Sequence, residues 1–196
     1  MTTTTIHGQL YEVFSPTEIS AHLFTLGKTI LSSGEKFDRV VALARGGVSI
    51  AQTLADIVGT KMISTLQCES YEATGKTKKP IISQPFTIDI TGEHILLIDD
   101  LADSGETLVF ATQFLLDRHA TSVKTATFLA KPWATLRPDF YAITSEAWII
   151  FPWETRETII SLTGIWGKKG DSLEEIAKNL KQLGFTQDQI ETFAQS

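Results

Sequence analysis

The stretch 94-HILLIDDLADSGETL-108 joins four apolar residues to two aspartates, a third acid, and a turn of small and hydroxyl-bearing residues. The short apolar run Ile95–Ile98 predicts a buried strand. Leucine and alanine recur at helical spacing after the turn, which predicts a helix from about Glu106 to Asp117. A buried strand, a turn and an amphipathic helix together form the repeating unit of an α/β fold.

The polar groups of this stretch are suited to binding a ligand. Side chains alternate along a strand, so Asp99 and Asp100 can approach one ligand only where the chain turns out of the sheet. Neighbouring carboxylates repel each other unless a cation such as Mg²⁺ or a sugar diol lies between them. In the turn Asp103–Thr107, the hydroxyls, the close backbone approach at Gly105 and the N–H groups of a helix N-terminus favour a phosphate. A strand end followed by a capped helix would explain the acid pair alone, but the whole stretch fits a ribose diol flanked by a phosphate.

Strands and helices alternate along much of the remaining chain. A second apolar run, Val40–Ala44, ends at Arg45-Gly46-Gly47 and leads into a helix that Gly59 closes. Further strands are expected at about Leu10–Phe14, Met62–Gln67, Val123–Ala130, Tyr141–Ile143 and Trp148–Phe151. This order predicts an α/β fold with a mainly parallel sheet flanked by helices, in which ligands collect beyond the carboxyl ends of the strands.

Two segments depart from this pattern. The polar segment Glu69–Glu93 is expected to form a long loop or mobile hairpin, and loops of this length are often functional lids. From about residue 157 the chain changes character, with capped helices expected after Ser172 and Thr186. We therefore expect a main domain over residues 1–156 and a C-terminal helical extension over residues 157–196, which would serve packing or self-association.

Composition argues against several classes of protein. A formal net charge of −6 disfavours general nucleic-acid binding, although a local basic cluster can still bind a small polyanion. The apolar runs are too short for a membrane span and the N-terminus lacks a signal-peptide pattern, so a cytoplasmic protein is expected. The single cysteine, Cys68, excludes an intrachain disulfide and a cysteine-cluster metal site. The four histidines are too scattered to suggest a metal site.

Two common nucleotide-binding signatures fail in this sequence. Gly27-Lys28-Thr29 and Gly75-Lys76-Thr77 look like the end of a P-loop, but His22 and Ser70 stand where that loop needs a glycine. No G-x-G-x-x-G motif follows a predicted strand. Neither motif therefore supports binding of ATP or NAD.

The opening stretch resembles the PRPP-binding signature of type I phosphoribosyltransferases, in which an apolar run, an acid pair and a Ser/Thr-Gly-x-Thr loop follow one another. The resemblance implies that Asp99 and Asp100 hold the ribose hydroxyls and support Mg²⁺. It also implies that Ser104, Gly105, Glu106 and Thr107 bind the 5′-phosphate, and that Arg45, Gly46 and Gly47 form the pyrophosphate loop. The segment with Ser70-Tyr71 and Lys76–Lys79 takes the place of the family's mobile hood, and its lysines fit a solvated charge run equally well.

Two further segments resemble the base-binding half of bacterial and archaeal xanthine-guanine phosphoribosyltransferases: Ala130-Lys131-Pro132 and residues 147–154. The resemblance implies that Lys131 donates to the 6-oxo group of a purine, that Trp148 stacks on the ring and that backbone at Ile149 meets the 2-substituent. Asp103 lies where the family places an acid near purine N7, and such an acid can exchange a proton with the base. Two departures, Glu106 beside the phosphate loop and Ile150 near the base, leave the preferred purine open.

These observations predict a Mg²⁺-dependent enzyme that converts PRPP and a 6-oxopurine into the nucleoside 5′-monophosphate and pyrophosphate. Asp99, Asp100 and Asp103 are its expected catalytic residues. The resemblance also implies a homo-oligomer, and no partner that is a nucleic acid or a membrane is expected. Two alternatives stay open: a regulator that senses PRPP or a nucleotide without catalysis, and a phosphoribosyltransferase for another base.

Overall fold

The computed structural model describes residues 1–71 and 79–194. Contacts within the chain divide it into two compact units. The larger unit is Ser20–Ser145, and the smaller one combines Met1–Ile19 with Glu146–Ser196. Each unit has a sheet of its own.

The larger unit is built on a six-stranded sheet with the order β5-β4-β3-β6-β7-β8. Its strands are β3 (Arg39–Ala44), β4 (Met62–Tyr71), β5 (Lys79–Ile82), β6 (His94–Ala102), β7 (Ser122–Ala130) and β8 (Phe140–Thr144). All neighbouring strands are parallel except β5, which pairs antiparallel with β4 at one edge. The predicted mainly parallel sheet flanked by helices is confirmed.

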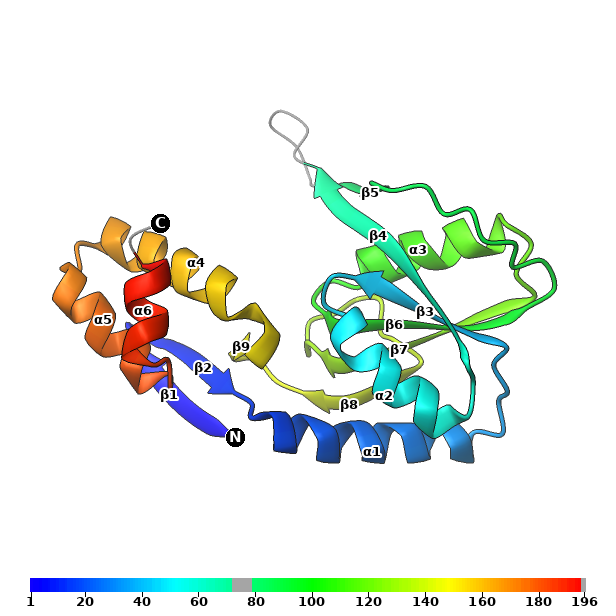
Figure 1. Cartoon of the computed structure of the whole chain (residues 1–196), viewed down its shortest axis with the longest axis horizontal. Coiled ribbons are helices and arrows are strands. Elements are labelled where there is room, and N and C mark those ends of the chain that lie inside the picture. Colours follow the sequence, from blue (N-terminus) through cyan, green and yellow to red (C-terminus); the bar gives the residue numbers. More distant parts are fainter. Residues whose placement is uncertain (72–78, 195–196) are drawn as a thin grey trace. The chain divides into compact units, whose positions relative to one another are not determined.

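Helices cover both faces of this sheet (Figure 1). They are α1 (Pro16–Ser32), which begins in the smaller unit, α2 (Val48–Val58) and α3 (Glu106–Leu116). α3 packs its buried leucines against alternate residues of β3 and β6, among them Leu43 and Leu97. The intervening strand residues are also fully buried, as expected for central parallel strands that carry helices on both faces.

The connections place a topological switch point between β3 and β6. From β3 the chain passes through α2 to β4 on one side, and from β6 it passes through α3 to β7 on the other side. In open α/β sheets, ligands bind in the crevice beyond the carboxyl ends of the two strands at such a point. The loop after β3 and the end of β6 therefore define the first place to look for a site.

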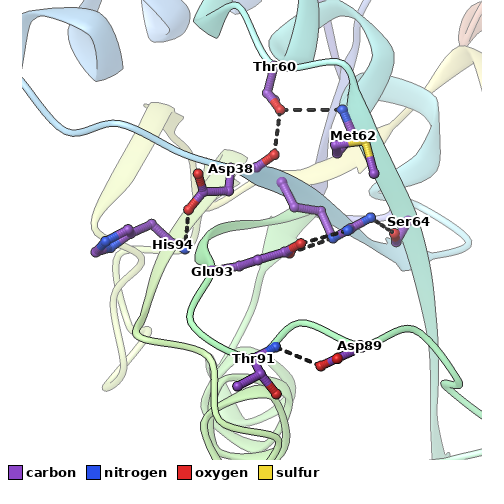
Figure 2. A network of polar contacts seen from close by, with 9 residues as sticks. Asp38, Thr60, Met62, Ser64, Asp89, Thr91, Glu93 and His94 are labelled. Carbon is purple, nitrogen blue, oxygen red and sulfur yellow. Dashed lines mark hydrogen bonds and ion pairs between the residues drawn. The ribbon is translucent and has the colours of Figure 1, made fainter.

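A polar network joins the strands at the opposite end of the sheet (Figure 2). The guanidinium of Arg39 donates to both carboxylate oxygens of Glu93, at 2.6 and 2.7 Å, and to the hydroxyl of Ser64 at 3.0 Å. Arg39 is only 5% exposed. The backbone N–H of His94 donates to Asp38 at 2.7 Å, so the starts of β3 and β6 are held together twice. This network is far along the strands from the switch point and serves the fold.

Replacement of Arg39 by methionine is expected to lower the free energy of unfolding by about 3 kcal/mol, because it leaves the Glu93 carboxylate without its bidentate partner. The double variant Arg39→Met/Glu93→Leu should recover part of that loss. Lys124→Met is the matched control, since its ion pair with Asp139 is solvent-exposed and worth less than about 1 kcal/mol. Urea unfolding of the four proteins measures these differences, and equal losses for Arg39→Met and Lys124→Met would contradict the assignment.

The smaller unit packs C-terminal helices against a small sheet of order β1-β2-β9. Its elements are β1 (Thr2–Ile6), β2 (Gln9–Val13), β9 (Trp148–Ile150), a 3-10 turn (Pro152–Glu154), α4 (Thr155–Lys169), α5 (Leu173–Gln182) and α6 (Gln187–Phe193). One hydrophobic core holds residues from the N-terminal and the C-terminal segments of this unit, including Ile6, Tyr11, Ile150 and Trp166. The contacts thus group the C-terminal helices with β9 and the N-terminal hairpin, and this grouping differs from the division predicted at residue 156.

Several element boundaries differ from the sequence-based prediction. β1 and α4 were not predicted, and β6 continues to Ala102 where a turn was expected after Ile98. The predicted loop 69–93 contains part of β4 and the whole of β5. Within the described residues, no helix is both long enough and apolar enough to cross a membrane.

Candidate active site

The predicted pyrophosphate loop and the acid pair meet at the switch point. Arg45, Gly46 and Gly47 connect β3 to α2, and the Ala44–Arg45 peptide bond is cis. A Cβ atom added to Gly46 would overlap the carboxyl group of Asp100, and one added to Gly47 would overlap the carbonyl oxygen of Ile98. The backbone of this loop therefore lies directly against β6, and a larger residue at either position would force the loop or its neighbour to move.

The two aspartates form an electrostatically strained pair. Asp100 is 8% exposed, and its backbone N–H donates to a carboxylate oxygen of Asp99 at 3.0 Å. Burial, followed by repulsion from Asp100, raises the pKa of Asp99 well above its ordinary value. Burial and the charges of Asp99 and Glu69 also raise the pKa of the nearby Cys68 thiol to about 11. This concentration of negative charge favours a cation or hydrogen-bond donors at the pair.

Asp99→Asn is expected to raise the melting temperature of the ligand-free protein at pH 7. A carboxyl whose pKa is raised by folding costs stability once the pH exceeds its unfolded-state value of about 3.9, and the cost disappears below that pH. The gain should therefore be present at pH 7 and absent near pH 3.5. Asp56→Asn, at an exposed position of α2, is the control and should show no comparable gain. A lower melting temperature for Asp99→Asn at pH 7 would contradict this account.

The predicted phosphate turn follows β6 and leads into α3. Gly105 occupies the N-cap position with φ of 88°, in the left-handed region that favours glycine. No side chain caps the helix there, and the Glu106 N–H donates to the Ser104 hydroxyl at 3.3 Å. An N-terminus without a side-chain cap leaves first-turn N–H groups available to an anion. The turn therefore has the geometry expected of a phosphate site.

The segment after β7 packs onto this turn. The backbone N–H of Lys131 donates to the Ala102 carbonyl at 2.8 Å, and that of Leu136 donates to the Ser104 carbonyl at 3.3 Å. Lys131 itself is buried, with 6% of its surface exposed. The indole N–H of Trp133 donates to Oδ1 of Asp103 at 2.8 Å. Lys131 is therefore brought to the same end of the sheet as the acids, together with a tryptophan that the sequence analysis did not single out.

The remaining predicted base contacts, Trp148 and Ile149, lie on β9 in the smaller unit. β9 is parallel to β2, with Tyr11 in register with Trp148, and the two rings lie 6.2 Å apart at 36°. Tyr11 in turn packs edge-on against Trp166 of α4 at 6.2 Å. Trp148 is 38% exposed, so part of its ring can still receive a ligand. The predicted residues of the larger unit lie at one end of its sheet. Trp148 and Ile149 belong to the other unit, so the role of these two residues in binding the base stays a prediction.

Within the described ranges 1–71 and 79–194, no group of three or more His, Cys, Asp and Glu residues could hold a metal ion by itself. Asp99 and Asp100 supply two carboxylates, so a cation bound there would take its other oxygen ligands from a substrate or from water. The hood-loop lysines at positions 76 and 78 lie outside the described residues. Contact with substrate and a solvated charge run both stay open for these lysines.

A glycine-lined loop, an acid pair and an uncapped helix N-terminus at one switch point are typical of α/β proteins that bind a phosphorylated sugar or nucleotide. The family comparison agrees with this class: a model of the phosphoribosyl transferase domain matches residues 17–158. The chain belongs to the phosphoribosyl transferase domain family. The match ends before α5 and α6.

Known relatives point in the same direction. The chain is 29% identical over 133 residues to the xanthine-guanine phosphoribosyltransferase of Gluconobacter oxydans, covering 66% of this chain and 76% of that protein. It is 32% identical over 121 residues to the enzyme of the same name from Desulfotalea psychrophila, covering 61% of this chain and 71% of that protein. Among solved structures, a purine phosphoribosyltransferase from Pyrococcus horikoshii superposes with a TM-score of 0.64 at 28% identity, covering 73% of this chain and 93% of that one.

Proposed function

We propose that this protein transfers the 5-phosphoribosyl group of PRPP to a 6-oxopurine, giving the nucleoside 5′-monophosphate and pyrophosphate. One observation carries the proposal: the Arg45–Gly47 loop, the acid pair and the Asp103–Thr107 turn converge at the switch point between β3 and β6. These three groups match the three parts of PRPP, which are the diphosphate, the ribose diol and the 5′-phosphate.

The chain's own residues would act mainly by positioning and electrostatics. The turn at Ser104–Thr107 would bind the 5′-phosphate through backbone N–H groups and hydroxyls. Asp99 and Asp100 would accept hydrogen bonds from the ribose hydroxyls, which relieves their mutual repulsion and fixes C1′. The Arg45 guanidinium and the N–H groups of Gly46 and Gly47 would stabilise the negative charge that develops on departing pyrophosphate.

The acid pair also fits a divalent cation, since positive charge would relieve the same repulsion. When bound with PRPP, Mg²⁺ would supply positive charge that helps to stabilise the leaving diphosphate. Asp99 and Asp100 would hold this ion directly or through the ribose hydroxyls. The dependence of the activity on Mg²⁺ is part of the proposal.

The choice of a 6-oxopurine rests on the names of the relatives and on the predicted base contacts. Lys131 would donate to the 6-oxo group, Trp148 would stack on the ring, and backbone at Ile149 would meet the 2-substituent. Asp103 would exchange the proton at N7 as N9 attacks C1′. A lysine donor at this position distinguishes an oxopurine from adenine, whose 6-amino group cannot accept a hydrogen bond from a lysine.

A turnover assay with a panel of bases tests the proposal. Hypoxanthine, guanine, xanthine, adenine and uracil are each mixed with the protein and PRPP, with Mg²⁺ or with excess EDTA, and product is followed by absorbance. We expect product from at least one oxopurine in Mg²⁺, none in EDTA, and none from adenine or uracil. Turnover confined to adenine or to a pyrimidine would overturn the assigned base class while keeping the family reaction.

A non-catalytic sensor of PRPP or a nucleotide is the second candidate. The switch-point site alone would serve either role. The buried Lys131, assigned here to the 6-oxo group, favours a purine-binding enzyme over a sensor of PRPP alone, because such a sensor needs no group that reads a base. A cytoplasmic location and a homo-oligomeric state also belong to the proposal, and a monomer in sedimentation at assay concentration would count against the latter.

A further inference from the structure

We propose that Trp133 is a positioning residue that orients Asp103, the acid assigned to the base proton, and links it to Lys131. This inference rests on the proposed function and adds a residue to the same site. Trp133 contacts both side chains that would read the edge of the purine carrying the 6-oxo group and N7. Its indole N–H donates to Asp103 Oδ1 at 2.8 Å, and its ring centroid lies 5.2 Å from the ammonium of Lys131.

The hydrogen bond fixes the direction of the carboxylate. A carboxylate has two oxygens, so holding Oδ1 on the indole leaves Oδ2 to face the base. Asp103 lies in an exposed turn, where an aspartate side chain otherwise samples several rotamers. A single donor that selects one rotamer therefore places the proton acceptor before the base arrives, which is the kind of preorganisation that general acid–base catalysis needs.

The ring face adds a second constraint. An ammonium within about 6 Å of a tryptophan centroid is attracted to the ring. Trp133 therefore holds the proposed cation on one of its faces and the proposed acid at its edge. One side chain thereby sets the spacing between the group for the 6-oxo oxygen and the group for N7.

The hydrogen bond from Trp133 to Asp103 should affect kcat more than it affects the stability of the fold. Trp133 is 54% exposed, so before substrate binds its hydrogen bond competes with water and contributes little to stability. A bound purine displaces water from this end of the site, and the bond to Asp103 strengthens as the local dielectric falls. Loss of the indole N–H should therefore appear in kcat.

Two substitutions at Trp133 test its N–H donor and its aromatic face separately. Trp133→Phe keeps an aromatic face for Lys131 and removes the N–H donor, and we expect kcat to fall about tenfold with both KM values within about twofold. Trp133→Leu removes the face as well, and should in addition raise the KM for the purine about threefold. Thr135→Val is the matched control in the same segment, because the hydrogen bond from its hydroxyl to the Ser104 carbonyl is long, at 3.5 Å. This variant should leave kcat and both KM values unchanged.

A double-mutant cycle with Asp103→Asn tests the coupling itself. If Trp133 acts through Asp103, Trp133→Phe will change kcat less than about twofold in the Asp103→Asn background. Independent, multiplying effects would overturn the inference, and so would a Trp133→Phe enzyme with wild-type kcat.

An NMR spectrum keeps this test separate from the proposed function. The protein has four tryptophans, so the indole signal lost in Trp133→Phe is that of Trp133. Asp103→Asn should move this signal upfield, because a carboxylate acceptor has been replaced by a weaker amide oxygen. An unmoved signal would overturn the inference even in an active enzyme. If the wild type turns over no purine, the proposed function fails, and the signal alone then decides whether Trp133 holds Asp103.

Discussion

Asp103→Asn should lower kcat for the preferred oxopurine by about 10²–10⁴-fold, the range for loss of a general acid–base group. Asparagine has nearly the same shape, and its amide oxygen can still accept the Trp133 N–H, so the turn should keep its conformation. It cannot take a proton at N7. The KM for PRPP should stay within about threefold, because the backbone groups of the phosphate turn are unchanged.

Steady-state kinetics on the purified variant, with melting temperature as a check on folding, measure this effect. Asp117→Asn, at the far end of α3, is the matched control and should retain wild-type kcat. A folded Asp103→Asn protein with more than about a third of wild-type kcat would remove Asp103 from the chemistry. Another group would then have to take the proton from purine N7.

Gly46→Ala should lower kcat/KM by about 100-fold or more, since displacements near 1 Å at a catalytic centre have costs of that order. The added Cβ would overlap the carboxyl group of Asp100, so either the loop or the acid pair has to move. Both are assigned to PRPP, one to the diphosphate and one to the ribose, so the KM for PRPP should rise as kcat falls. The KM for the purine should change much less.

Gly164→Ala provides a matched control for this substitution. Gly164 lies within α4, where an added Cβ meets no atom within 4 Å, and alanine is favoured over glycine inside a helix. This variant should be as active as the wild type and slightly more stable. If Gly46→Ala were equally active, the loop after β3 would not contact the acid pair in the working enzyme.

Much of the larger unit could be predicted from sequence because its signals are local. The apolar run before Asp99 defines β6, the glycines after Ala44 mark the turn into α2, and the leucine spacing after Glu106 defines α3. Parallel strands bring these turns to one edge of the sheet, so the site at the switch point follows from the order of the elements.

The features that could not be predicted from sequence depend on contacts between residues far apart in the chain. β1 consists largely of threonines and is a strand because it pairs with β2, which the sequence does not indicate. Tyr11 supports Trp148 only through the pairing of β2 with β9. The contact of Trp133 with Asp103 joins side chains thirty positions apart, and its only sequence signal was its place next to Lys131-Pro132.

Transfer of the phosphoribosyl group from PRPP to a purine, with release of pyrophosphate, can be followed by phosphorus NMR of a single reaction that contains Mg²⁺, PRPP and the preferred oxopurine. We predict that the PRPP signals decline while those of a nucleoside 5′-monophosphate and of pyrophosphate rise in equal amounts, and that nothing changes when the base is omitted. PRPP that stays intact beside every oxopurine, while it still raises the melting temperature of the protein, would contradict the claim and identify a sensor.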